Sequence, residues 1–65
     1  MWQDKLKAEL ETVRQGRVEY GGDIHSIEKI MGYLDENATT ENTIKQLKKA
    51  NLNWFAGKLI NNLYE

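Results

Sequence analysis

The fold of this chain is decided by residues 43–60, which read TIKQLKKANLNWFAGKLI. When residues 41–64 are plotted as one helix, the apolar side chains fall on two faces that are rotated by about 120–140° from each other. The first face holds Ile44, Leu47 and Trp54, and the second holds Leu52, Phe55, Leu59 and Leu63. Either one long helix shows two faces to different neighbours, or the helix breaks near Asn51-Leu52-Asn53. Asparagine forms helices poorly and turns well, so we predict the break.

Upstream of this stretch, a first helix is indicated by apolar residues at helical spacing. They are Trp2, Leu6, Leu10 and Val13. Glycine inside a helix costs about 1 kcal/mol, so the helix could end at Gly16. We nevertheless predict that it runs on to Tyr20, which lies in phase with the stripe, and that Gly21-Gly22 is the first clear break.

A second helix is predicted to begin after Asp23, because an aspartate carboxylate accepts the free amide hydrogens of a first turn. Its apolar stripe consists of Ile24, Ile27, Ile30, Met31 and Leu34. We expect Gly32 to let another helix approach closely. This helix is expected to end at Asp35, Glu36 and Asn37, with Asn37 as a left-handed cap. The next helix is expected to begin with Thr39 or Thr40 as its N-cap and with Glu41 in its first turn.

These patterns predict the fold class. No segment alternates for long enough to be a strand, and no internal repeat is present. The sequence predicts an all-α fold, a small bundle of three or four helices in a single helical domain over residues 1–65. The C-terminal pair of helices is similar in outline to a helix-turn-helix, although its turn lacks the usual glycine.

The composition restricts how so short a chain gains stability. A core of this size supplies no more than about 3–5 kcal/mol. The 65 residues include no cysteine and one histidine, which excludes disulfides, cysteine-based zinc sites and a histidine-rich metal site. Self-association as a homodimer and an adequate monomeric bundle are both left open. No apolar run reaches the length of a signal or membrane-spanning segment, so we expect a cytoplasmic protein without a membrane partner.

Signatures of catalysis are missing from the sequence. No glycine-rich loop lies between a strand and a helix to hold a nucleotide phosphate. Ser26 is the only serine and follows His25 directly, and neighbours in sequence do not face each other on a helix. We therefore expect a protein that is not an enzyme and that uses no cofactor and no metal.

The charges are sorted along the chain. Residues 21–42 carry one lysine against five acids, whereas residues 43–65 carry four lysines against Glu65. The two regions can attract each other within one chain or between two chains, or one of them can meet an oppositely charged partner. A small DNA-binding regulator that uses the C-terminal helical pair is the alternative function, with nucleic acid contacted by Lys45, Lys48, Lys49 and Lys58.

The aromatic residues favour a protein partner. Trp54 and Phe55 are adjacent, so on a helix they point about 100° apart, and one small core cannot easily take both. Tryptophan is a favoured anchor of protein interfaces. The leading hypothesis is a helical interaction module that regulates or inhibits a larger protein. In being short, rich in asparagine, free of cysteine and without enzyme motifs, the chain is similar to small accessory proteins of bacteria and their phages. The predicted partner-binding residues are Trp2, Trp54, Phe55, Leu59 and Leu63.

Overall fold

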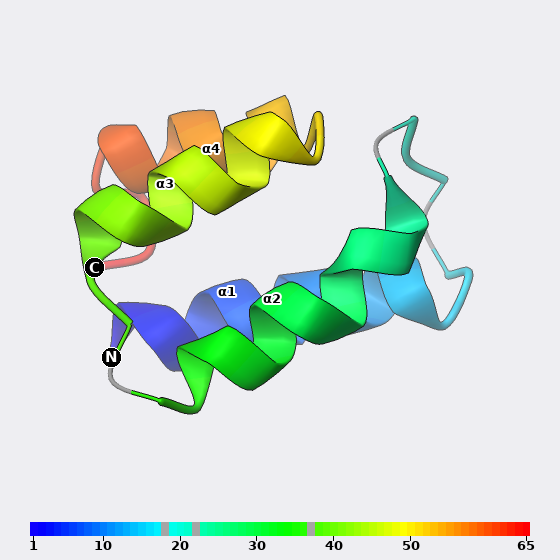
Figure 1. The fold of residues 1–65 in the computed structure, drawn as a ribbon, viewed down its shortest axis with the longest axis horizontal. Helices are drawn as coiled ribbons and strands as arrows, with labels where there is room; N and C mark the ends of the chain where they lie inside the picture. Colours follow the sequence, from blue (N-terminus) through cyan, green and yellow to red (C-terminus); the bar gives the residue numbers. More distant parts are fainter. Residues whose placement is uncertain (18, 22, 37) are drawn as a thin grey trace.

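The structure is a computed structural model and describes residues 1–17, 19–21, 23–36 and 38–65. Its elements are the α-helices α1 (Trp2–Arg14), α2 (Ile27–Leu34), α3 (Thr40–Lys49) and α4 (Asn53–Ile60), with a 3-10 turn η1 (Ile24–Ser26) before α2. The described residues form helices and no strand, so the predicted all-α bundle is confirmed. Successive helices run in opposite directions, with α1 beside α2 in one layer and α3 beside α4 in the other (Figure 1). Both termini lie at the same end of the molecule (Figure 1).

The first helix ends earlier than predicted. It stops at Arg14, and Gly16 adopts the left-handed conformation with φ of 74°. The Arg17 amide then donates to the Thr12 carbonyl at 3.0 Å, and the Gly16 amide donates to the Val13 carbonyl at 3.0 Å. These two bonds satisfy carbonyls that a helix end leaves free, and glycine enters this conformation at little steric cost. The prediction that the helix continues to Tyr20 was therefore wrong.

The predicted break between residues 40 and 60 is confirmed. Asn51, the second residue after α3, adopts a left-handed φ of 59°. The Leu52 amide donates to the Leu47 carbonyl at 2.8 Å, and the Asn51 amide donates to the Lys48 carbonyl at 3.0 Å. Asparagine tolerates this conformation better than most residues that carry a side chain, so it replaces the glycine that such a turn usually contains.

The predicted N-caps are confirmed where the structure describes them. The Asp23 carboxylate accepts the His25 amide at 3.1 Å and the Ser26 hydroxyl at 2.7 Å. The hydrogen bond from the Ser26 hydroxyl contributes most to lowering the pKa of Asp23, the loss of some hydration opposes it, and the bond from the His25 amide adds to it. The Thr39 hydroxyl accepts the Asn42 amide at 3.2 Å. The predicted cap Asn37 lies outside the described residues.

Gly32 does not have the predicted role within this chain. It is exposed on α2, and a side chain added there would meet no neighbouring atom within 4 Å. No other helix of the described chain approaches it. No helix among the described residues has both the length and the apolar character needed to cross a membrane.

The core draws on all four α-helices and on the segments that join them. Its largest fully buried apolar side chains are Leu6, Leu10, Ile27, Ile30, Leu47, Leu52 and Phe55. Thr43 is also fully buried, and its hydroxyl donates to the Thr39 carbonyl at 2.7 Å. The hydroxyl is thus satisfied within its own helix, which avoids the cost of an unpaired buried donor.

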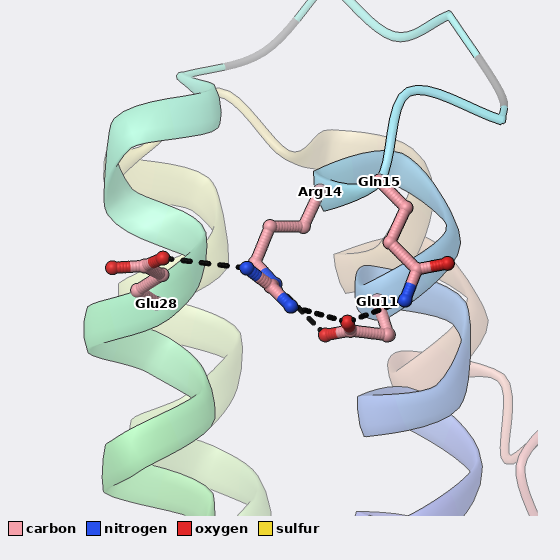
Figure 2. A network of polar contacts seen from close by, with 4 residues as sticks. All are labelled: Glu11, Arg14, Gln15 and Glu28. Carbon is pink, nitrogen blue, oxygen red and sulfur yellow. Dashed lines mark hydrogen bonds and ion pairs between the residues drawn. The ribbon is translucent and has the colours of Figure 1, made fainter.

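Ion pairs on the surface connect α1 to its neighbours. Arg14 binds the carboxylate of Glu11 on its own helix and lies 3.5 Å from a carboxylate oxygen of Glu28 on α2 (Figure 2). The hydrogen bond from Arg14 lowers the pKa of Glu11. Lys7 pairs with Asp35 at the other end of α2. Among the described residues, no salt bridge joins residues 21–42 to residues 43–65, so the two regions of opposite charge are not paired directly.

Candidate functional site

The Tyr20 hydroxyl caps the first turn of α4, although Tyr20 lies far from α4 in the sequence. The residue before α4 is Leu52, whose side chain cannot accept a hydrogen bond. The Trp54 amide donates instead to the Tyr20 hydroxyl at 2.8 Å, across 34 positions of the sequence. This bond satisfies one of the amides that a helix start leaves free. It also holds Tyr20 against α4, where its ring lies 5.0 Å from that of Phe55.

A mostly apolar pocket of about 290 Å³ lies between α1, Tyr20 and α4, and we call it the aromatic pocket. Its lining residues are Glu9, Thr12, Val13, Tyr20, Trp54 and Phe55. The Trp54 and Phe55 rings meet edge to face, with centroids 5.0 Å apart and an angle of 81° between their planes. Phe55 is buried, whereas Trp54 keeps 54% of its surface exposed. The pocket therefore combines one buried aromatic side chain with one large aromatic side chain that is exposed to solvent.

One ion pair lies beside the aromatic pocket. The Lys58 ammonium is 2.7 Å from a carboxylate oxygen of Glu9, which joins α4 to α1. The same ammonium lies 4.6 Å from the centroid of the Trp54 ring and 4.8 Å from that of Tyr64, within the range of cation–π attraction. The charge of Lys58 thus attracts the Trp54 ring as well as the Glu9 carboxylate. Tyr64 is buried, and burial raises the pKa of its phenol, with the negative charge of Glu9 adding to the shift.

The structure divides the predicted partner-binding residues. Trp54 and Leu63 are exposed, and Trp2 is half-buried against the core. Phe55 and Leu59 are 1% and 3% exposed, so their side chains belong to the core of this chain, and of the two only Phe55 also lines the aromatic pocket. Leu63 departs from the face of Leu59 because α4 ends at Ile60, and Asn62 then adopts a left-handed φ of 57°.

The four lysines of the DNA-binding alternative do not form one surface. Lys45, Lys48 and Lys49 are exposed on α3, whereas Lys58 on α4 is paired with Glu9 and half-buried between two aromatic rings. A helix-turn-helix that reads DNA with its second helix would use the exposed face of α4. Lys58 therefore differs from the other three lysines in being paired with a carboxylate, and the contact of these four lysines with nucleic acid stays a prediction.

Two residues of the pocket could not be found from sequence patterns. Glu9 lies 49 positions before Lys58, and Tyr20 lies 34 positions before Trp54. No spacing rule connects residues so far apart, because their meeting depends on how α4 folds back over α1. The sequence offered one local indication of this site, Tyr20, which is an aromatic residue in a largely polar stretch.

Replacing Tyr20 by phenylalanine is expected to lower the free energy of unfolding by about 0.5–1.5 kcal/mol, because the Trp54 amide loses its acceptor while the ring is kept. Urea denaturation followed by circular dichroism measures this change. Tyr33→Phe is the control: Tyr33 is also half-buried, and its hydroxyl makes no hydrogen bond among the described residues. Equal losses of stability in the two variants would contradict the capping role of Tyr20.

Two surfaces of the described chain are thus distinguished by their chemistry. The aromatic pocket offers apolar walls with an exposed tryptophan, and α3 offers exposed lysines. The described residues hold no group of three or more histidine, cysteine, aspartate or glutamate side chains that is placed to bind a metal ion. Comparison of this chain with protein-family models, with curated proteins and with solved structures finds no match.

Proposed function

We propose that this chain is a small, non-enzymatic helical binding protein that regulates or inhibits a larger protein, with the aromatic pocket as its contact site. The observation that carries the proposal is Trp54, which lines the pocket and stays 54% exposed beside the buried Phe55. Tryptophan is enriched among the residues that supply most of the binding energy of protein interfaces. A cytoplasmic accessory protein of a bacterium or phage is the setting that this proposal assumes.

The size and chemistry of the pocket favour one side chain of a protein as its occupant. Its volume of about 290 Å³ lies just below the range for small-molecule sites, about 300–1,000 Å³. The walls are formed by Tyr20, Trp54, Phe55 and Val13, and Glu9 at the rim is neutralised by Lys58. Apolar walls with a paired charge suit an aromatic or branched aliphatic side chain. We propose that the partner presents such a side chain to this pocket.

The arrangement of the polar groups supports binding rather than catalysis. The Ser26 hydroxyl donates to the Asp23 carboxylate at 2.7 Å and belongs to the cap of η1. A serine nucleophile would need a base within hydrogen-bonding reach and a third group that orients this base. Among the described side chains, Ser26 has only Asp23 as a hydrogen-bond partner, and Asp23 is exposed.

Reading of DNA by α4 has less support. Its basic residue Lys58 is engaged by Glu9, and its exposed side chains include the apolar Trp54 and Ile60. Recognition helices contact phosphates and base edges with polar and basic groups. The exposed face of α4 therefore fits an apolar partner surface better than a DNA groove.

The test compares two exposed apolar residues of α4. Proteins from the native cell are captured on the wild-type chain, and the captured protein is purified and titrated against Trp54→Ala and Ile60→Ala by calorimetry. Ile60 is the matched control, since it is 51% exposed but does not line the pocket. We expect Trp54→Ala to weaken binding at least about 30-fold, the effect of losing a hot spot of about 2 kcal/mol, and Ile60→Ala to change it little.

Three results would overturn the proposal. Equal binding by wild type and Trp54→Ala removes the pocket as the contact site, and an equally large decrease in affinity in both variants shows a diffuse apolar contact. A dimer of the wild type that dissociates in Trp54→Ala, measured by sedimentation equilibrium without any partner, shows that the pocket is filled by a second copy rather than by a larger protein.

A further inference from the structure

The outer face of α3 carries a concentration of positive charge. Lys45, Lys48 and Lys49 are exposed, and their positions fall within an arc of about 100° on the helix. The opposite face is formed by Thr43 and Leu47, which are fully buried. Lysines in a last turn also interact favourably with the negative end of the helix dipole. That effect accounts for Lys48 and Lys49, but not for Lys45 near the middle of α3.

A fourth lysine reaches this face from α2. A hollow of about 260 Å³ is lined by Lys29 and Ser26 on one side and by Gln46 and Lys49 of α3 on the other. A second hollow of about 240 Å³ is lined by Asn42, Lys45, Gln46 and Lys49. The two hollows share Gln46 and Lys49, so they form one continuous surface. We call Lys29, Lys45, Lys48 and Lys49, together with the two hollows, the lysine face.

The charges of the lysine face are not used within the chain. Among the described residues no salt bridge involves any of its four lysines, whereas Lys7, Arg14 and Lys58 are all paired with carboxylates. Two acids lie close to it. Asp23 lines the first hollow, but its carboxylate accepts hydrogen bonds from His25 and Ser26. Glu41 lies in the first turn of α3, one helical turn before Lys45, but no salt bridge between these two side chains is formed in the described structure.

We propose that the lysine face binds the phosphate backbone of nucleic acid without reading its sequence. Lysine, serine, asparagine and glutamine are the side chains that commonly contact phosphates and sugars, and all four types line the two hollows. Lysine is depleted from protein interfaces, which argues against an acidic protein. In the part of the chain that the structure describes, the large exposed apolar residues are Met1, Ile24, Trp54, Ile60 and Leu63. None of them lines the two hollows, so the apolar anchor of a membrane-binding helix is missing there.

This proposal is independent of the proposed function, because the aromatic pocket and the lysine face share no residue. With at most four phosphates contacted, binding is expected to be weak, with a dissociation constant of about 10⁻⁴ to 10⁻⁶ M that rises steeply with salt. Failure of either proposal therefore leaves the other standing.

The test is fluorescence anisotropy of labelled short single-stranded and double-stranded DNA with random sequence. The variant is Lys45→Gln/Lys49→Gln, and the matched control is Lys5→Gln/Arg17→Gln, which removes two exposed charges outside the lysine face. We expect wild type and control to bind at low salt, and the variant to bind at least about tenfold more weakly. The slope of log affinity against log salt is expected to fall by about two in the variant, one for each lysine that no longer neutralises a phosphate. Circular dichroism verifies that all three proteins are folded.

Four results overturn this proposal. The first is no binding of DNA by the wild type at low salt. The second is an equal decrease in affinity in the variant and the control, which shows an effect of net charge alone. The third is binding of anionic phosphatidylserine vesicles as tight as binding of DNA, and the fourth is equally tight binding of polyglutamate. Either of the last two shows that the lysine face does not distinguish nucleic acid from other polyanions.

Discussion

Phe55→Ala is expected to unfold most of the chain at 25 °C, whereas Trp54→Ala leaves it folded. Phe55 is 1% exposed and contacts the rings of Tyr20 and Trp54. Truncating a buried phenylalanine costs about 3–5 kcal/mol, which equals the whole stability that a core of this size supplies. Trp54 is 54% exposed, and its truncation removes one aromatic pair and one cation–π interaction, together about 1–2.5 kcal/mol, which is less than the stability of the core.

Far-UV circular dichroism and urea denaturation of the two variants measure this difference. A helical spectrum for Trp54→Ala beside a largely unfolded Phe55→Ala is the expected outcome. Phe55→Leu, which keeps most of the apolar volume, is expected to restore the helical spectrum. If Phe55→Ala keeps the stability of the wild type, Phe55 does not belong to the core and the assignment of roles to the two neighbours is wrong.

Leu52→Ala is expected to cost about 2–5 kcal/mol, and Leu63→Ala is expected to change the stability by no more than about 0.5 kcal/mol. Both leucines follow an asparagine with left-handed φ, and their amides donate to the fifth preceding carbonyl, at 2.8 Å for Leu52 and 2.9 Å for Leu63. Their local structure is therefore the same. Leu52 is fully buried between α3 and α4, whereas Leu63 is 62% exposed, so only the first substitution leaves a cavity.

Urea denaturation of the two variants under the same conditions provides the comparison. Leu52→Met, which changes the volume little, is expected to cost less than about 1.5 kcal/mol and keeps the comparison measurable if Leu52→Ala does not fold. Similar decreases in stability for Leu52→Ala and Leu63→Ala would mean that Leu63 packs against the protein in solution, for example in a homodimer.

The ends of the helices show how far local patterns predict this fold. The caps Asp23 and Thr39 and the turn at Asn51 were predicted correctly, because each acts on amides or carbonyls within a few residues. The end of α1 was predicted wrongly. The apolar phase of Tyr20 was given more weight than Gly16, and Tyr20 in fact packs against α4 rather than continuing α1.

The candidate site could be predicted only in part. The sequence indicates that one small core cannot easily take both Trp54 and Phe55, but not which of them is buried. It also does not determine whether Phe55 and Leu59, two of the predicted partner-binding residues, pack into the core of this chain. The turn at Asn51 folds α4 back onto α3, and Leu52, Phe55 and Leu59 are buried as a result, whereas Leu63 stays exposed.

The sequence by itself determined which segments of this chain are helical and, apart from the end of α1, where they turn. Capping groups and left-handed asparagines act between residues at most five positions apart. Only the tertiary structure decided which surfaces remain for function. The bond between Tyr20 and Trp54 spans 34 positions, and the ion pair between Glu9 and Lys58 spans 49. These pairs form because four short helices can bury their apolar faces in only a few arrangements. The packing of the helices, rather than the local sequence pattern, therefore sets which aromatic ring stays exposed.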